Sequence, residues 1–163
     1  MKYLLGYPAE LREQAQSLLS QGRLLDSVLR RYPEAHAVRS ESALYDYVNT
    51  LKQQHLRNAP PISKVAYDPR LQLVAQALGT HTAVSRVQGT RLKAKREIRV
   101  ASLFKDAPAA FLKMIVVHEL AHLKEREHDN AFYALCTYME PQYHRLEFDT
   151  RLWLTALETQ AAP

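Results

Sequence analysis

At 163 residues, with 47% hydrophobic and 24% charged side chains, the chain suits one soluble globular domain that can bury a core without disulfides or structural metals. The single cysteine, Cys136, excludes an internal disulfide. No apolar run forms a signal-peptide core or approaches the ~20 residues of a membrane-spanning helix. We therefore expect a cytoplasmic protein with no membrane partner. The net charge of +5 permits nucleotides or nucleic acid as partners, although many basic proteins bind neither.

Helical patterns dominate the first third of the chain. Residues 9–32 place leucines on one side at four- and seven-residue intervals, with Gly22 as a point where the helix can divide. Residues 40–56 repeat the pattern after Ser40 or Ser42, either of which can serve as the N-cap. The sequence therefore predicts an N-terminal region built of helices.

A pair of prolines at residues 60–61 breaks regular structure after these helices. We take the break as the boundary between an N-terminal helical region, residues 1–59, and a core, residues 60–163, on which that region packs. The core begins with a short predicted helix, residues 68–79, which has Asp68 as its N-cap and a glycine at its end.

Residues 81–102 have the alternation that is typical of strands. From Leu92 to Val100, apolar and charged side chains alternate with a period of two, and Gly89 marks a turn before them, which predicts a β-hairpin and a short antiparallel sheet. The charged face carries one acid, Glu97, against four basic residues: Arg91, Lys93, Lys95 and Arg99. Such a face can be a solvated surface that protects a sheet edge, a phosphate-binding patch, or an edge strand that pairs with an extended peptide.

Three more helices are expected in the last third. The first spans residues 107–124 after Asp106 as its N-cap, the second spans residues 129–140, and the third spans residues 143–159. In chain order, helices come before and after a short antiparallel sheet. This order predicts an α+β fold.

Residues 118–122, HELAH, form an H-E-x-x-H pattern on the first of these helices. Because residues four apart lie on the same helical face, His118 and His122 converge on one point, as two ligands of zinc do. Glu119 can then act as the general base on a zinc-activated water and pass the proton to the leaving group. The alternative is a buried helix whose histidines are satisfied by backbone or carboxylate partners, but the apolar run at 111–117 makes unpaired polar groups costly there, and metal coordination removes that cost.

A third imidazole, that of His128, follows six residues after His122. A continuous helix would carry it to the wrong side, so we expect the helix to end near residues 125–127 and the chain to turn back, with Asp129 as a cap of the next helix. The alternatives are an exposed, non-ligating His128 and a carboxylate ligand from one of two downstream residues, Glu140 or Glu147.

Residues 114–154 resemble the YgjP-like metallo-hydrolases, bacterial relatives of the SprT and WLM metallopeptidase-like domains, and the likeness extends back through residues 56–68 and 81–101. The resemblance implies a compact zincin-like core with an active-site helix. It matches the family's metal-binding histidines and catalytic glutamate to four residues: His118, His122, His128 and Glu119. Members are classed as metallopeptidase-like, and close relatives are assigned the hydrolysis of UTP to UMP and pyrophosphate.

The sequence and the resemblance together predict a zinc-dependent hydrolase with one Zn²⁺ ion, although Mn, Co or Ni would also bind three imidazoles. The expected substrate is a nucleoside triphosphate such as UTP, held by the basic strand face, or a peptide aligned by a strand edge. A non-enzymatic alternative is a metal-stabilised module that binds nucleic acid. His144, beside Tyr143, is a candidate for binding substrate or donating to the transition state, and Tyr133 is an equal candidate.

Overall fold

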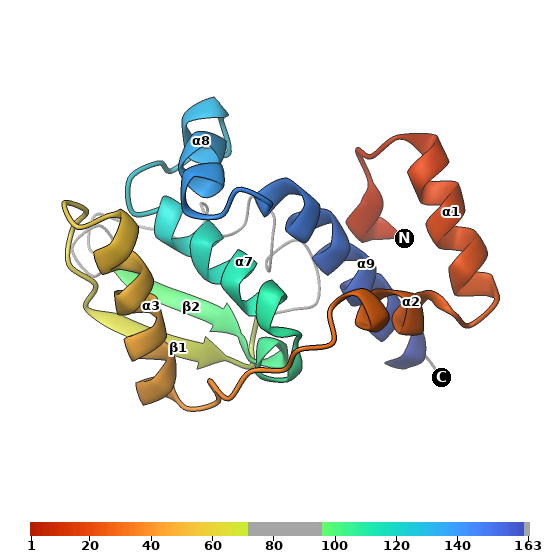
Figure 1. Cartoon of the computed structure of the whole chain (residues 1–163), viewed down its shortest axis with the longest axis horizontal. Coiled ribbons are helices and arrows are strands. Elements are labelled where there is room, and N and C mark those ends of the chain that lie inside the picture. Colours follow the sequence, from red (N-terminus) through yellow and green to blue (C-terminus); the bar gives the residue numbers. More distant parts are fainter. Residues whose placement is uncertain (72–95, 162–163) are drawn as a thin grey trace.

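The computed structural model describes residues 1–71 and 96–161. In chain order its elements are η1 (Lys2–Leu4), α1 (Ala9–Ser20), α2 (Leu24–Arg31), α3 (Glu41–His55), β1 (Lys64–Asp68), β2 (Glu97–Ala101), η2 (Ser102–Asp106), α7 (Ala109–Ala121), α8 (Asn130–Met139) and α9 (Tyr143–Ala161). Figure 1 shows α7 between the two-stranded sheet and α9, with α1 and α2 beyond α9. The α+β class expected from the sequence is confirmed.

The two described strands pair in parallel, with Val65 opposite Ile98 and Tyr67 opposite Val100. The antiparallel sheet expected from the sequence is therefore wrong. The alternation of side chains shows that β2 is extended, but it carries no information on which segment pairs with it or in which direction. Gly89 and the first strand of the expected hairpin lie outside the described residues.

The sequence does not predict β1, because Asp68 and the proline after it have the pattern of a helix start. In the structure Asp68 is the last residue of β1, and its Oδ1 accepts a hydrogen bond from the Arg70 backbone amide at 2.8 Å. An aspartate that bonds its own backbone two residues on closes a turn as readily as it caps a helix. Residues 72–79 of the expected helix lie outside the described residues.

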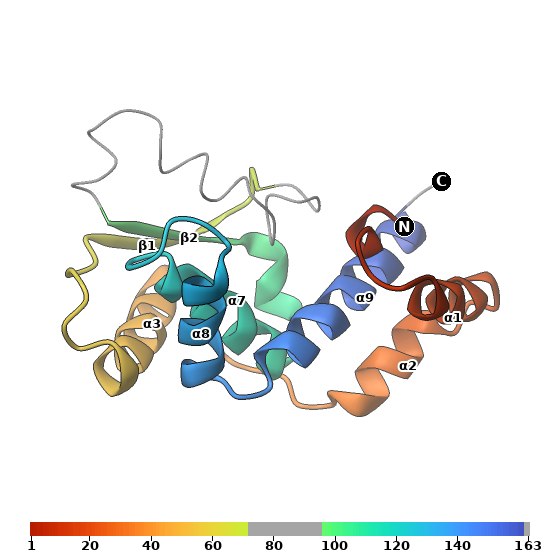
Figure 2. The same ribbon diagram turned by 90° about the horizontal axis from the view of Figure 1, so that it is seen from above.

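The sheet has one apolar and one polar face, because successive side chains of a strand point to opposite sides. The apolar face consists of four buried side chains: Val65, Tyr67, Ile98 and Val100. Helices α3 and α7 lie on this side of the sheet, where α3 contacts β1 and α7 contacts β2 (Figure 2). Glu97 and Arg99 alternate with the apolar residues of β2 and therefore belong to the polar face.

Helix α7 is buried on every side, because its sequence is apolar on every side. From Phe111 to Ala121 its side chains are buried, apart from Lys113. The helix contacts α3, β2, α8 and α9, so it forms the centre of the core. Polar side chains on this helix are therefore held in a dry and closely packed environment.

The start of α7 differs from the expectation. Pro108 occupies the N-cap position without a side-chain cap, whereas Asp106 lies in η2 and pairs with Arg39 at 2.7 Å. The Ala109 amide donates instead to the carbonyl oxygen of Glu34 at 2.8 Å. A distant backbone carbonyl thus satisfies one of the free amides at the helix start, which no local sequence pattern predicts.

The N-terminal helices follow the expected pattern. Gly22 separates α1 from α2 with a positive φ of 68°, and Ser40, rather than Ser42, caps α3 by accepting a hydrogen bond from the Ala43 amide. Helix α2 packs on α9, and η1 contacts α9 as well. Over the described part of the chain, none of the helices has the length and apolar character needed to cross a membrane.

Candidate metal centre

Two imidazoles project from the end of α7, His118 from its last turn and His122 from its C-cap position. His118 and His122 are 0% and 6% exposed, and their ring centroids lie 4.9 Å apart. This is the spacing that residues i and i+4 give on one face of a helix. Because α7 is central to the core, both rings lie where a polar group needs a partner.

The turn after α7 delivers the third imidazole. The helix ends at Ala121, somewhat earlier than the expected residues 125–127, and the Glu125 amide then bonds the Ala121 carbonyl at 2.9 Å. Asp129 caps α8 by accepting from the Phe132 amide, as expected. The bend between the two helices places the His128 ring 5.1 Å from that of His118. The predicted change of direction is confirmed.

Among the described residues, His118, His122 and His128 form a group whose candidate ligand atoms all lie within 4.8 Å of one another. The Nε2 atoms of His122 and His128 are 3.0 Å apart. Three imidazole donors with room for a further ligand form the donor set of catalytic zinc sites. The arrangement fits one divalent cation.

Hydrogen bonds on the outer side of two rings fix which nitrogen faces the cluster. His122 Nδ1 lies 2.9 Å from the Glu125 carbonyl, which can only accept, so Nδ1 carries the proton and Nε2 keeps its lone pair. His118 Nδ1 lies 2.8 Å from the Tyr143 hydroxyl. Metal-binding histidines commonly donate their other ring nitrogen to an oxygen in this way.

An aromatic side chain packs against all three rings. Phe132, on the first turn of α8, is fully buried, with ring centroids 5.0, 4.6 and 4.9 Å from those of His118, His122 and His128. Burial is the main cause that lowers the pKa of His128, and the Arg151 charge adds to it, while Glu127 and Asp129 oppose it. The lowered pKa favours the neutral imidazole, which is the form that binds metals.

Glu119, the expected general base, is 3% exposed and lies on the same buried turn of α7 as His118. The two carboxylates considered as alternative third ligands have other surroundings. Glu140 Oε1 pairs with Lys113 Nζ at 3.0 Å, and Glu147 Oε2 lies 3.6 Å from Arg151 Nη2. Within the described part of the chain, neither belongs to the group of candidate ligand atoms.

His144 and Tyr133 lie together beside this group. Their ring centroids are 5.3 Å apart, and the Tyr133 ring lies 6.5 Å from that of His128. His144 is exposed on the first turn of α9. The structure thus places both candidates near His128 but outside the cluster of imidazoles.

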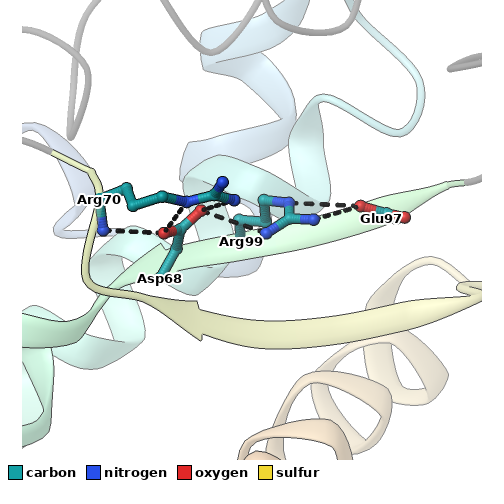
Figure 3. Close-up of polar contacts among 4 residues, drawn as sticks. All are labelled: Asp68, Arg70, Glu97 and Arg99. Atoms are coloured by element: carbon teal, nitrogen blue, oxygen red, sulfur yellow. Dashed lines mark hydrogen bonds and ion pairs between the residues drawn. The ribbon is translucent and has the colours of Figure 1, made fainter.

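Arg99 is held by acidic neighbours on the polar face of the sheet (Figure 3). Its guanidinium lies 3.1 Å from Glu97 Oε2 and 3.1 Å from Asp68 Oδ2. Burial raises the pKa of Asp68, but hydrogen bonds and charge from Arg70 and the charge of Arg99 outweigh it, so the pKa is lowered overall. The other three basic residues expected on this face, Arg91, Lys93 and Lys95, lie outside the described residues.

Sequence reasoning missed a row of polar side chains on α9, formed by Tyr143, Glu147 and Arg151. Arg151 Nη1 donates to the Tyr3 carbonyl at 3.1 Å, and its side chain lies within hydrogen-bonding reach of the Tyr7 hydroxyl. Burial is the main cause that raises the pKa of Glu147, and the charge of Arg151 opposes it. The four-residue spacing could have shown that these residues share one helical face, but not that this face meets α7.

We expect the Cys136 thiol to be unreactive in the folded protein. It is fully buried in α8, and burial is the main cause that raises its pKa to about 12, so almost no reactive thiolate exists near pH 8. Ellman's reagent should label the native protein slowly and the guanidinium-denatured protein at once, with one thiol per chain. Rapid labelling of the native protein would show that the packing of α8 on α7 and α9 does not bury this side chain.

Comparison with known proteins gives the family. The family model of the YgjP-like metallopeptidase domain matches residues 3–151. The UTP pyrophosphatase of Escherichia coli (strain K12) is 60% identical over 157 residues, which cover 96% of this chain and 94% of that protein. No solved structure matches the chain. The resemblance noted in the sequence is confirmed, together with the zincin-like α+β fold that it implies, and the chain therefore belongs to the YgjP-like family of metallopeptidase-domain hydrolases.

Proposed function

We propose that this protein is a zinc-dependent hydrolase that cleaves nucleoside triphosphates, with UTP as the first substrate to test, to the monophosphate and pyrophosphate. The observation that carries the proposal is the meeting of three imidazoles, two from the end of a buried helix and one from the turn that follows it, with two Nε2 atoms 3.0 Å apart. The substrate is suggested by the name of the relative that is 60% identical. We expect the enzyme to act in the cytoplasm, where its substrate would be met.

In this proposal His118, His122 and His128 would hold one Zn²⁺ ion. A zinc ion bound by three imidazoles lowers the pKa of water to about 7 and stabilises negative charge on phosphoryl oxygens. Glu119 takes a proton from the attacking water. The bond between that water oxygen and phosphorus forms as the phosphoanhydride bond between the α- and β-phosphates breaks, and Glu119 returns the proton to the products.

Phe132 and the packing around α7 support this chemistry. Phe132 contacts all three imidazoles and is itself fully buried, so the rings have little freedom to rotate and water is excluded behind them. Fixed donors in a dry site act on charge without first having to reorganise. The packing of α8 on α7 therefore holds the imidazole rings in fixed positions on the buried side of the site.

A metallopeptidase is the second candidate, favoured by the description of the family model that matches residues 3–151. The two functions separate in a screen of the zinc-loaded protein against UTP, CTP, ATP, GTP and unfolded casein, with Glu119→Gln as the blank. We expect pyrophosphate release from UTP that the blank lacks. Cleavage of casein without release of pyrophosphate from any nucleotide would replace the nucleotide proposal by the peptidase one.

The basic strand face expected from the sequence gives a prediction that separates the same two functions. If Lys93 and Lys95 bind phosphates, replacing both with Ala should raise the KM for UTP by about 100-fold or more and change kcat little, since each charged hydrogen bond contributes about 1.5–3 kcal/mol and every 1.4 kcal/mol is about tenfold. A charge-matched control is Arg23→Ala with Arg30→Ala, two exposed residues at α2, far from α8 in Figure 1. An unchanged KM in the lysine variant would show that these two lysines do not bind the nucleotide.

A further inference from the structure

Tyr143, the first residue of α9, places its hydroxyl directly behind a candidate metal ligand. The side chain is 0% exposed, and its hydroxyl oxygen lies 2.8 Å from His118 Nδ1. The two rings are nearly parallel, with an interplanar angle of 18° and centroids 6.4 Å apart. A fully buried phenol needs partners for both its proton and its lone pairs, and one of them is this imidazole.

The second partner sets the direction of the hydrogen bonds. Glu147 lies one turn further along α9, is 6% exposed, and its carboxylate lies within hydrogen-bonding reach of the Tyr143 hydroxyl. A carboxylate only accepts, so the Tyr143 proton points to Glu147 and the phenol oxygen is left to accept from His118 Nδ1. The Cys136 thiol is also within hydrogen-bonding reach of the phenol and can donate to it only weakly.

The outer end of this row is tied to the N-terminus of the chain. Arg151 Nη2 lies 3.6 Å from Glu147 Oε2, and Arg151 Nη1 donates to the Tyr3 carbonyl at 3.1 Å. Helix α9 and the segment η1, which is far from it in sequence, thus hold the carboxylate in place.

We propose that Tyr143 is a positioning residue, which accepts the Nδ1 proton of His118 and donates its own to Glu147, so that His118 is held in the tautomer and orientation that direct Nε2 to the metal. The inference rests on the proposed metal site. It adds a function for two residues of α9, and it explains why a tyrosine and a carboxylate are buried beside a cluster of histidines. Outer hydrogen bonds of this kind raise the affinity of a ligand for its metal by roughly 10- to 100-fold.

The test is the zinc dissociation constant of the full-length protein, measured by competition with a chromophoric chelator. Tyr143→Phe keeps the ring and removes the hydroxyl, and we expect zinc binding roughly 10- to 100-fold weaker, with activity restored at saturating zinc. The matched control is Tyr67→Phe, because the Tyr67 hydroxyl on β1 is also hydrogen-bonded, at 2.6 Å to the carbonyl oxygen of the half-buried Val38. The control should lose some thermal stability and retain the zinc affinity of the unmodified protein.

Glu147→Gln keeps the proposal falsifiable if Tyr143→Phe does not fold. It retains an accepting oxygen but not the charge, so we expect zinc affinity to fall several-fold, between the values of the unmodified protein and of Tyr143→Phe. The cobalt-substituted protein gives a second readout, since its visible spectrum should shift in Tyr143→Phe and not in Tyr67→Phe. Equal zinc affinity in Tyr143→Phe and Tyr67→Phe overturns the positioning role alone, whereas an unmodified protein that binds no zinc overturns the proposed function and this inference together.

Discussion

Glu119→Gln should abolish most of the hydrolytic activity and leave the metal in place. Glutamine has the size and shape of glutamate but cannot take a proton from water, so the loss of a general base should lower kcat by roughly 10²- to 10⁴-fold. Glu119 is buried, and an amide there introduces no charge and no large change in volume. Pyrophosphate release from UTP measures the loss, and zinc content measured on the same sample shows whether the metal remains.

A carboxylate remote from the site provides the control. Glu13→Gln makes the same chemical change at an exposed position of α1, and it should leave both kcat and zinc content unchanged. Activity of Glu119→Gln close to that of Glu13→Gln would show that another group takes the proton. The non-enzymatic alternative, a module that binds nucleic acid, would gain support only if such a protein also bound nucleic acid with a steep dependence on salt.

His128→Ala should weaken zinc binding by more than roughly 100-fold. The loss of an outer hydrogen bond to a ligand can cost up to about 100-fold in affinity, and this variant removes a ligand itself. His128 is half-buried in the turn before α8, outside the centre of the core, so the variant should fold. Chelator competition measures the affinity, and melting temperature without metal checks the fold. We expect the melting temperatures of His128→Ala and of the unmodified protein, both without metal, to differ by only a few degrees.

The matched control is His55→Ala, which removes an imidazole from α3 that makes an edge-to-face contact with Tyr138, with ring centroids 5.7 Å apart. It should bind zinc as the unmodified protein does. If His128→Ala binds zinc equally well, the third ligand is another side chain. The two carboxylates considered as alternative third ligands, Glu140 and Glu147, would then be the first residues to replace.

The local parts of the site are predictable from the sequence, because they depend on spacing within one helix. Residues four apart meet on one face of α7, so the meeting of His118 and His122 follows from helical geometry alone. The turn to His128 follows from the need to change direction within six residues and from the capping pattern at Asp129. In both cases the information lies within a few residues of the feature.

The parts that the sequence does not predict depend on contacts between distant segments. The alternation in β2 identifies a strand, but its parallel partner β1 lies across residues 69–96, and Asp68 at the end of β1 has the pattern of a helix cap. Likewise, the alternation that predicts the basic face does not show that Arg99 forms hydrogen bonds to Asp68 and Glu97. Pairing partners are set by packing in the whole fold, so a single sequence reveals each strand without its neighbour.

The same reason explains why the row of polar residues on α9 was missed. Tyr143 and Glu147 have the spacing of one helical face, but the histidine that Tyr143 contacts lies on α7. Nothing in the spacing distinguishes this face from a solvated one. Only the packing of α9 on α7 shows that the phenol is fully buried against the imidazole.

X-ray absorption spectroscopy of the zinc-loaded protein tests most directly whether these histidines form the metal site. We expect one zinc ion per chain, with scattering from three imidazole rings at about 2.0–2.1 Å and from one further oxygen. Fewer than three imidazoles around the ion, or a sulfur ligand at about 2.3 Å, would contradict the site built from α7 and the turn that follows it.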